Sequence, residues 1–193
     1  MLKGIYNEWL SFYLHPRIYW QQIRSGKNKS IFSFRKFFLP AIILTAPFIL
    51  IGDIIFNSRN GFLWKEWIVN AIREVLFLFL IFIFSIIIIR MVMKWFKIGV
   101  KMSAIRRIAT YSITPALITA LFTGLFPFLD LGGIAPWYGL FLVFTGIETF
   151  FSIPEKKKFY FYFVLFMVMF VVIMMVTFTL QRTALLIYSW NGT

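Results

Sequence analysis

Most of this chain consists of long apolar runs, which are separated by short basic or turn-forming stretches. Five runs are apolar enough to be membrane helices, at about residues 37–56, 75–93, 105–129, 134–153 and 159–180. They are continuous, whereas the strands of a membrane β-barrel alternate apolar and polar residues. The pattern therefore predicts an all-α, polytopic membrane protein, with residues 37–193 forming a domain of five transmembrane helices.

Residues 1–36 follow a different pattern. Leu2, Ile5, Trp9 and Tyr13 recur at helical spacing, with polar residues between them. A short amphipathic helix with Trp and Tyr on its apolar face suits the headgroup plane of a bilayer. We expect residues 1–36 to form an interfacial amphipathic segment on the cytoplasmic side, lying on the membrane rather than crossing it.

The third run carries a stripe of small residues at every fourth position, which lets a second helix approach closely inside lipid. Ser112 begins this stripe, and the helix-packing positions that we expect on the third and fourth runs are Ala116, Ala120, Gly124, Gly139 and Gly146. The second and fifth runs contain few small residues and are expected at the periphery. The third run is therefore predicted to be the central helix.

Two prolines, Pro47 and Pro115, fall near the middle of the first and third runs. Each removes a backbone donor and is expected to kink its helix, at a depth of roughly 15 Å by the helical rise. Interrupted helices with polar groups at this depth are how many transporters build their binding sites. Alternatively, neighbouring Ser and Thr side chains simply satisfy the backbone groups that proline leaves without a partner.

The net charge is +13, and sixteen of the 20 Lys and Arg residues lie in the N-terminal segment and in the loops after the second and fourth runs. Because positive loops stay inside, we expect a multi-pass protein of the cell membrane with its N-terminus in the cytoplasm and its C-terminus outside. The same charges predict contact with anionic lipids rather than nucleic acid. The residues predicted to contact headgroups are Arg35, Lys36, Lys97, Lys101, Arg106, Arg107, Lys156, Lys157 and Lys158.

Few polar groups fall inside the runs. Arg90, Tyr111 and Glu148 come out at similar depth, and an intramembrane acid is usually paired. We therefore consider an Arg90–Glu148 or a Tyr111–Glu148 pair, which with Ser112 and Thr114 would make a polar intramembrane site. The alternative is that Arg90 extends to the headgroups while Glu148 meets the lysine-rich loop.

Catalytic motifs find little support in the sequence. The chain has one histidine and no cysteine, and it lacks the H-E-x-x-H pattern of zinc proteases. We expect no enzymatic activity, no metal and no cofactor.

The sequence Tyr111-Ser112-Ile113-Thr114-Pro115 resembles the third span of the Yip family, the Ypt/Rab-interacting five-span membrane proteins, in its bacterial branch. Leu14-His15-Pro16-Arg17-Ile18-Tyr19 resembles the family's N-terminal approach, and the stretch from Gly146 to Lys158 resembles its fourth span and lysine-rich turn. Thr110 stands where the family often has glycine. The resemblance implies a non-enzymatic protein of membrane organisation or trafficking.

Two functions remain open from the sequence. One is a membrane-organising scaffold that contacts anionic lipid and binds other membrane proteins or further copies of itself. The other is a small-solute, ion or lipid transporter or channel with a site between spans 1, 3 and 4. If other helices fill the small-residue stripe, the scaffold is favoured; if the stripe lines a cavity that reaches Glu148, transport is favoured.

Overall fold

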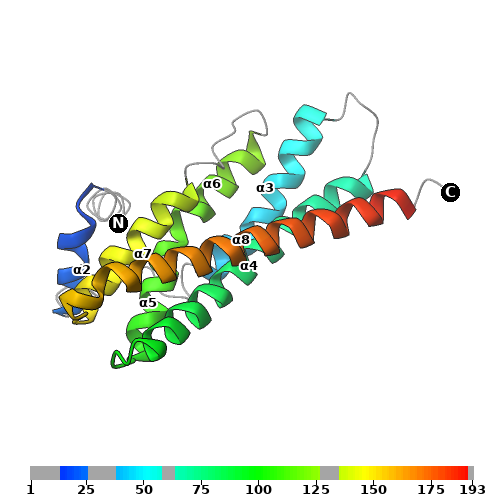
Figure 1. The fold of residues 1–193 in the computed structure, drawn as a ribbon. Helices are drawn as coiled ribbons and strands as arrows, with labels where there is room; N and C mark the ends of the chain where they lie inside the picture. The colour runs from blue at the N-terminus through cyan, green and yellow to red at the C-terminus, as the bar shows by residue number, and fades with distance from the viewer. Residues whose placement is uncertain (1–13, 26–37, 58–63, 127–134, 191–193) are drawn as a thin grey trace.

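The computed structural model describes residues 14–25, 38–57, 64–126 and 135–190. The regular elements in these ranges are all α-helices: α2 Pro16–Arg24, α3 Leu39–Asn57, α4 Trp64–Trp95, α5 Met102–Ser112, α6 Thr114–Leu125, α7 Ala135–Phe150 and α8 Glu155–Trp190 (Figure 1). The all-α prediction is confirmed.

Four helical stretches are long and apolar enough to cross a membrane: Leu39–Phe56, Trp64–Trp95, Met102–Leu125 and Glu155–Ile187. They correspond to the predicted first, second, third and fifth spans, and they support a multi-pass membrane protein. The apolar part of α7, Trp137–Phe150, is shorter. With 16 residues, α7 is about 24 Å long, which is less than a typical hydrocarbon core. That α7 also crosses the membrane, as the predicted fourth span, therefore stays a prediction.

The third span is the most enclosed of the four. In Met102–Leu125, 56% of the apolar stretch is buried inside the protein, against 28% in α4 and 11% in α8. The predicted central position of this span and the predicted peripheral position of α8 agree with these values. The surface of α8 carries bulky residues, because small residues favour close packing between helices and give no advantage on a face that meets lipid.

Glycines bring α3 and α6 into backbone contact. A Cβ on Gly52 would collide with the carbonyl oxygen of Gly124, and a Cβ on Gly124 would lie 2.8 Å from Cγ1 of Ile49. Ala116 and Ala120, on the same stripe, are partly buried against a cluster of apolar side chains to which α3, α4, α5 and α6 contribute. The end of the central span is thus held against α3.

The helix α7 packs against α5 through the same kind of contact. A Cβ on Gly139 would lie 2.7 Å from the carbonyl oxygen of Ser112, and a Cβ on Gly146 would lie 3.1 Å from Ile108 and from Trp20. Rising numbers on α7 meet falling numbers on α5, so the two helices are antiparallel. The predicted small positions of the fourth run therefore lie where helices touch.

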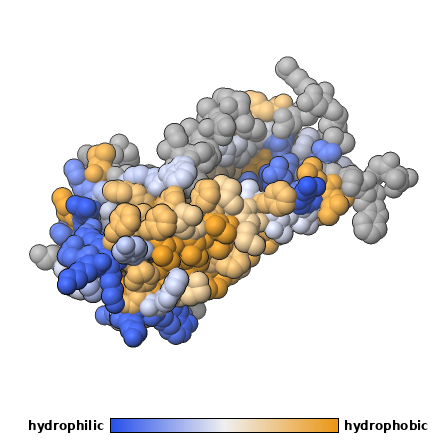
Figure 2. Space-filling model, in the orientation of Figure 1, coloured by the Kyte–Doolittle hydropathy of each residue, from blue (hydrophilic) through white to orange (hydrophobic). Residues whose placement is uncertain are grey.

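One end of the bundle is basic. At this end α4 and α7 finish while α5 and α8 begin (Figure 1), and the ring of Phe96, which follows α4, lies 5.4 Å from the ring of Phe161 in α8. We call this the basic end, and its exposed Lys and Arg side chains include Lys94, Lys97, Lys101, Arg106, Arg107, Lys156 and Lys157. Figure 2 shows hydrophilic residues gathered there, next to an apolar surface along α8.

Candidate functional site

The central span is broken at Ile113, between α5 and α6. Pro115 lies in the first turn of α6 and has no N–H to donate to the carbonyl of Tyr111 four residues earlier. The chain continues because the Ile113 N–H donates to Ala109 O at 3.2 Å and the Leu117 N–H donates to Ile113 O at 3.0 Å. By contrast, α3 is continuous through Pro47, whose predicted bend stays a prediction.

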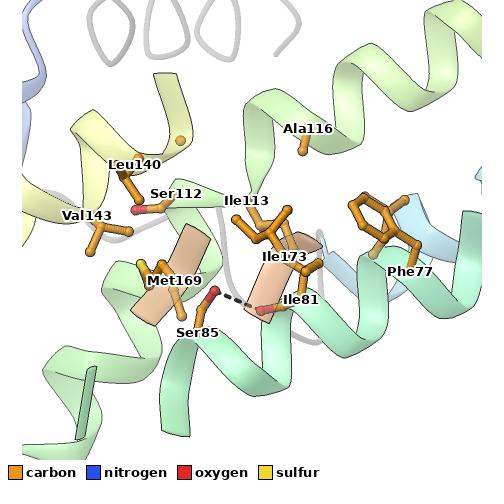
Figure 3. A pocket seen from close by; sticks show the side chains of 13 residues that line it. Phe77, Ile81, Ser85, Ser112, Ile113, Ala116, Leu140, Val143, Met169 and Ile173 are labelled. Carbon is orange, nitrogen blue, oxygen red and sulfur yellow. Dashed lines mark hydrogen bonds between the residues drawn. The ribbon is translucent and has the colours of Figure 1, made fainter. Parts of the chain in front are cut away.

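A cavity of about 70 Å³ lies beside this break (Figure 3). Residues of α4, α5, α6, α7 and α8 line it, and most are apolar. Among the described residues, none from α3 contributes to it. The cavity thus lies among α4, α5, α6, α7 and α8, and not between spans 1, 3 and 4, where the sequence led us to expect a transport site.

Two serine hydroxyls face this apolar lining, and they differ. The Ser85 hydroxyl donates to Ile81 O at 2.7 Å within α4, shown as a dashed line in Figure 3. The Ser112 side chain is only 6% exposed, and its hydroxyl has no hydrogen-bond partner within the described ranges. A buried hydroxyl without a partner costs about 1–3 kcal/mol, so Ser112 lowers the stability of the fold at this point.

The neighbouring threonine, Thr114, is satisfied locally. Its hydroxyl donates to Thr110 O at 3.1 Å, and the hydroxyl of Thr110 donates to Arg106 O at 2.8 Å. Such bonds to the carbonyl four residues earlier are a common way for hydroxyls to be buried in a helix. Of Ser112 and Thr114, Ser112 is therefore the one whose buried hydroxyl has no hydrogen-bond partner among the described residues.

Tyr111 is fully buried, and its ring packs against α2. The ring centroids of Tyr19 and Trp20 lie 5.7 and 5.2 Å from that of Tyr111, both edge-on. Tyr19, Trp20 and Ile23 form the apolar face of α2 and are almost completely buried. In the described part of the N-terminal segment, this face therefore packs on protein instead of on lipid. The rest of the predicted interfacial segment, with Arg35 and Lys36, lies outside the described residues.

Glu148, near the end of α7, has ion-pair partners other than those predicted. Its carboxylate lies 2.7 Å from Nζ of Lys158 and 3.6 Å from Nη2 of Arg17, whereas Arg90 is exposed on α4. The Arg90–Glu148 and Tyr111–Glu148 pairs are thus replaced by the alternative in which Glu148 meets the lysine-rich loop. A second contact holds α2 nearby, because Arg24 Nη1 donates to Thr149 O at 2.6 Å.

The predicted polar site is therefore divided into three parts: Ser112 at the cavity, Glu148 at the basic end and Arg90 on the surface. Sequence reasoning missed Ser85. A signal was available, since Ser85 is the one polar residue between Glu74 and Arg90. Within the described ranges, no group of three or more His, Cys, Asp or Glu side chains could hold a metal ion.

No protein-family model, curated protein or solved structure matches this chain. The assignment of a family and of a function therefore depends on the residues and the geometry described above.

Proposed function

We propose that this chain is a non-enzymatic membrane protein of the Yip type that organises membrane by holding anionic lipid at its basic end, on the cytoplasmic side. The observation that carries the proposal is the gathering of exposed Lys and Arg side chains in the turn between α4 and α5, in the first half of α5 and in the first turn of α8. Each such charge near an anionic surface contributes about 1 kcal/mol to the attraction. The apolar surface beside it keeps these turns at headgroup level.

The topology of the proposal follows from the direction of the helices. Both α5 and α8 begin at the basic end, so the chain between them must return there. We assign this return to α7, which then crosses the membrane as the predicted fourth span, with the bilayer thinning locally around a short helix. The long helix α8 then leads away from the basic end and places the C-terminus outside.

The contacts along the central span support a closed scaffold. The stripe is covered at Ser112 by Gly139 of α7 and at Gly124 by Ile49 and Gly52 of α3. A transporter of small solutes is the second candidate, and it is favoured by the cavity and by the Ser112 hydroxyl, which has no partner among the described residues. At about 70 Å³ the cavity has less than half the volume of an engineered cavity that binds benzene.

Lipid retention tests the proposal with a matched pair of variants. The full chain is taken from bilayers of mixed phosphatidylglycerol and phosphatidylcholine, and native mass spectrometry counts the lipids that remain bound. The double variant Lys97→Gln, Lys101→Gln removes two exposed charges at the basic end. The control Lys65→Gln, Arg182→Gln removes two exposed charges elsewhere.

We expect phosphatidylglycerol enrichment to fall by roughly fivefold or more in the basic-end variant, and not in the control. An equal loss in both variants, or no enrichment in the wild type, would contradict the proposed function. Flux of a small solute into vesicles that depends on Ser112 would instead favour the second candidate.

A further inference from the structure

The turn after α4 and the first turns of α8 meet at the basic end. The ring of Phe96 lies 5.4 Å from the ring of Phe161, with an angle of 80° between the ring planes. Lys97 directly follows Phe96, and Lys157 lies one helical turn before Phe161 on the same side of α8. Both lysines are exposed. Two ammonium groups from distant parts of the chain therefore flank one pair of aromatic rings, and we call this place the Lys97–Lys157 site.

The turn that carries Lys97 has a closely defined backbone. The Ile98 N–H donates to Met93 O at 2.9 Å, and the Lys97 N–H donates to Lys94 O at 3.0 Å. These two bonds form the helix-ending motif in which the residue after the helix is left-handed, and Lys97 has a φ of 56°. Glycine adopts this conformation without strain, whereas a lysine there costs conformational energy. A lysine at a position that favours glycine indicates that its side chain has a use.

The two lysines carry a surplus of positive charge. The ion pairs at this end within the described ranges use Lys158 and Arg17, and they leave the site itself without a carboxylate partner. Glu155 is two residues from Lys157, but the helical twist places it on the opposite side of α8, where it lies 3.5 Å from Nζ of Lys158. The other exposed cations near these turns are Lys94, Lys101 and Lys156. The charge at the site therefore fits phosphate groups that approach from the surface.

The surface next to the two lysines is aromatic and apolar. Trp95 is 72% exposed, with its ring 6.1 Å from that of Phe96, and Tyr160 of α8 is 65% exposed. Exposed Trp and Tyr side chains are typical of the headgroup level of a bilayer. Met91 and Ile87 continue the exposed apolar surface along α4. A headgroup at the two lysines would thus have its acyl chains beside α4 and α8.

Two cations on separate segments distinguish between anionic headgroups. A headgroup with one phosphate brings one negative charge, so a second lipid molecule must be ordered before both lysines are neutralised. In a lipid with two phosphates joined through one glycerol, the second contact is intramolecular and follows the first at a high effective concentration. A lipid with two phosphates is therefore favoured over one with a single phosphate, even when the concentration of phosphate is the same.

We propose that the Lys97–Lys157 site binds a lipid with two phosphates, a diphosphatidylglycerol (cardiolipin), in preference to lipids with one phosphate. One phosphate accepts from the ammonium of Lys97 and the other accepts from the ammonium of Lys157. The acyl chains lie against α4 and α8. The proposal rests on the proposed function and deepens it, because it assigns a preferred lipid class to the basic end.

The experiment takes the full chain from bilayers of phosphatidylcholine that contain cardiolipin and phosphatidylglycerol in equal amounts of phosphate. Native mass spectrometry gives the ratio of cardiolipin to phosphatidylglycerol retained, counted per phosphate. Lys97→Gly and Lys157→Gln each remove one of the two charges, and glycine suits the left-handed backbone, so we expect the turn to stay folded. Lys156→Gln is the matched control, because this exposed neighbour of Lys157 points about 100° away around α8.

We expect the wild type to retain cardiolipin over phosphatidylglycerol by about fivefold per phosphate, the contribution of one additional charge contact. Lys97→Gly and Lys157→Gln should each bring this ratio close to one, and the double variant should lower it no further, because either change alone removes the bridge. Lys156→Gln should keep the wild-type ratio. The proposal is overturned if the wild type shows no preference, if the ratio is unchanged in Lys97→Gly and Lys157→Gln, or if Lys156→Gln lowers it equally.

The two lipid proposals fail separately. Equal retention of cardiolipin and phosphatidylglycerol, both above phosphatidylcholine, would remove the two-phosphate site and leave the anionic-lipid function in place. Retention of cardiolipin alone would support the site and contradict the broader function, in which phosphatidylglycerol is also enriched. Retention of neither lipid above phosphatidylcholine would overturn both proposals.

Discussion

Replacement of Ser112 by alanine tests whether the cavity beside the break is empty. The hydroxyl of Ser112 is buried and has no partner within the described ranges. Removing it should recover about 1–3 kcal/mol of the cost of an unsatisfied polar group. Alanine also has a higher helix propensity than serine, by about 0.5 kcal/mol. Against this, the cavity grows by one small atom, which costs a few tenths of a kcal/mol at about 24 cal/mol per Å³.

The expected net effect is that Ser112→Ala raises the free energy of unfolding by about 1–3 kcal/mol. Ser85→Ala is the matched control, because its hydroxyl lines the same cavity but donates to Ile81 O. There the lost hydrogen bond and the gain in helix propensity nearly cancel, so we expect a change within about 0.5 kcal/mol.

Unfolding in mixed micelles with increasing sodium dodecyl sulfate, followed by tryptophan fluorescence, measures both variants. Ser112→Ala could instead be less stable than the wild type by about 1 kcal/mol or more, which is the net contribution of roughly one hydrogen bond. That result would show that the hydroxyl of Ser112 has a partner, such as a bound water molecule. The cavity would then be hydrated at mid-membrane, and the transport candidate would gain at the expense of the closed scaffold.

Two further predictions concern packing and topology. Gly52→Ala should lower the free energy of unfolding by roughly 1–3 kcal/mol, since its Cβ would collide with the carbonyl of Gly124, whereas Gly99→Ala should have little effect because nothing lies within 4 Å of a Cβ there. Equal unfolding midpoints for these two variants in the same micelle assay would show that α3 and α6 are not in backbone contact. A reporter fused after Thr193 should be active only on the outer side of the membrane. Activity in the cytoplasm would contradict the proposal that α7 crosses the membrane.

Much of the helical framework follows from apolar run lengths. Hydropathy is a sum over consecutive residues, so it locates α3, α4 and α8 without knowledge of their neighbours. Their ends are less predictable, because a helix continues past its apolar part. The helix α4 begins at Trp64 and α8 ends at Trp190, well outside the predicted spans of about residues 75–93 and 159–180.

The polar pairs were harder to predict, for a geometrical reason. The helical rise places Arg90 and Glu148 at similar depth, but depth does not determine which way each side chain points around its helix. In the structure Glu148 meets Lys158 and Arg17, and Arg90 is exposed. The partner of Glu148 on α2 could not be predicted either, because an amphipathic helix has the same pattern on lipid and on protein.

The docking of α2 on α7 has a consequence for the order of events during synthesis. Arg24 and Thr149, which hold the two helices together, are 125 residues apart in the chain. At roughly 5–20 residues per second, α2 waits on the order of ten seconds before its partner surface is made. During that interval the membrane surface is the nearest place for Trp20 and its apolar neighbours. Nascent chains truncated before Gly146 should therefore cross-link Trp20 to lipid, and longer chains should cross-link it to α7.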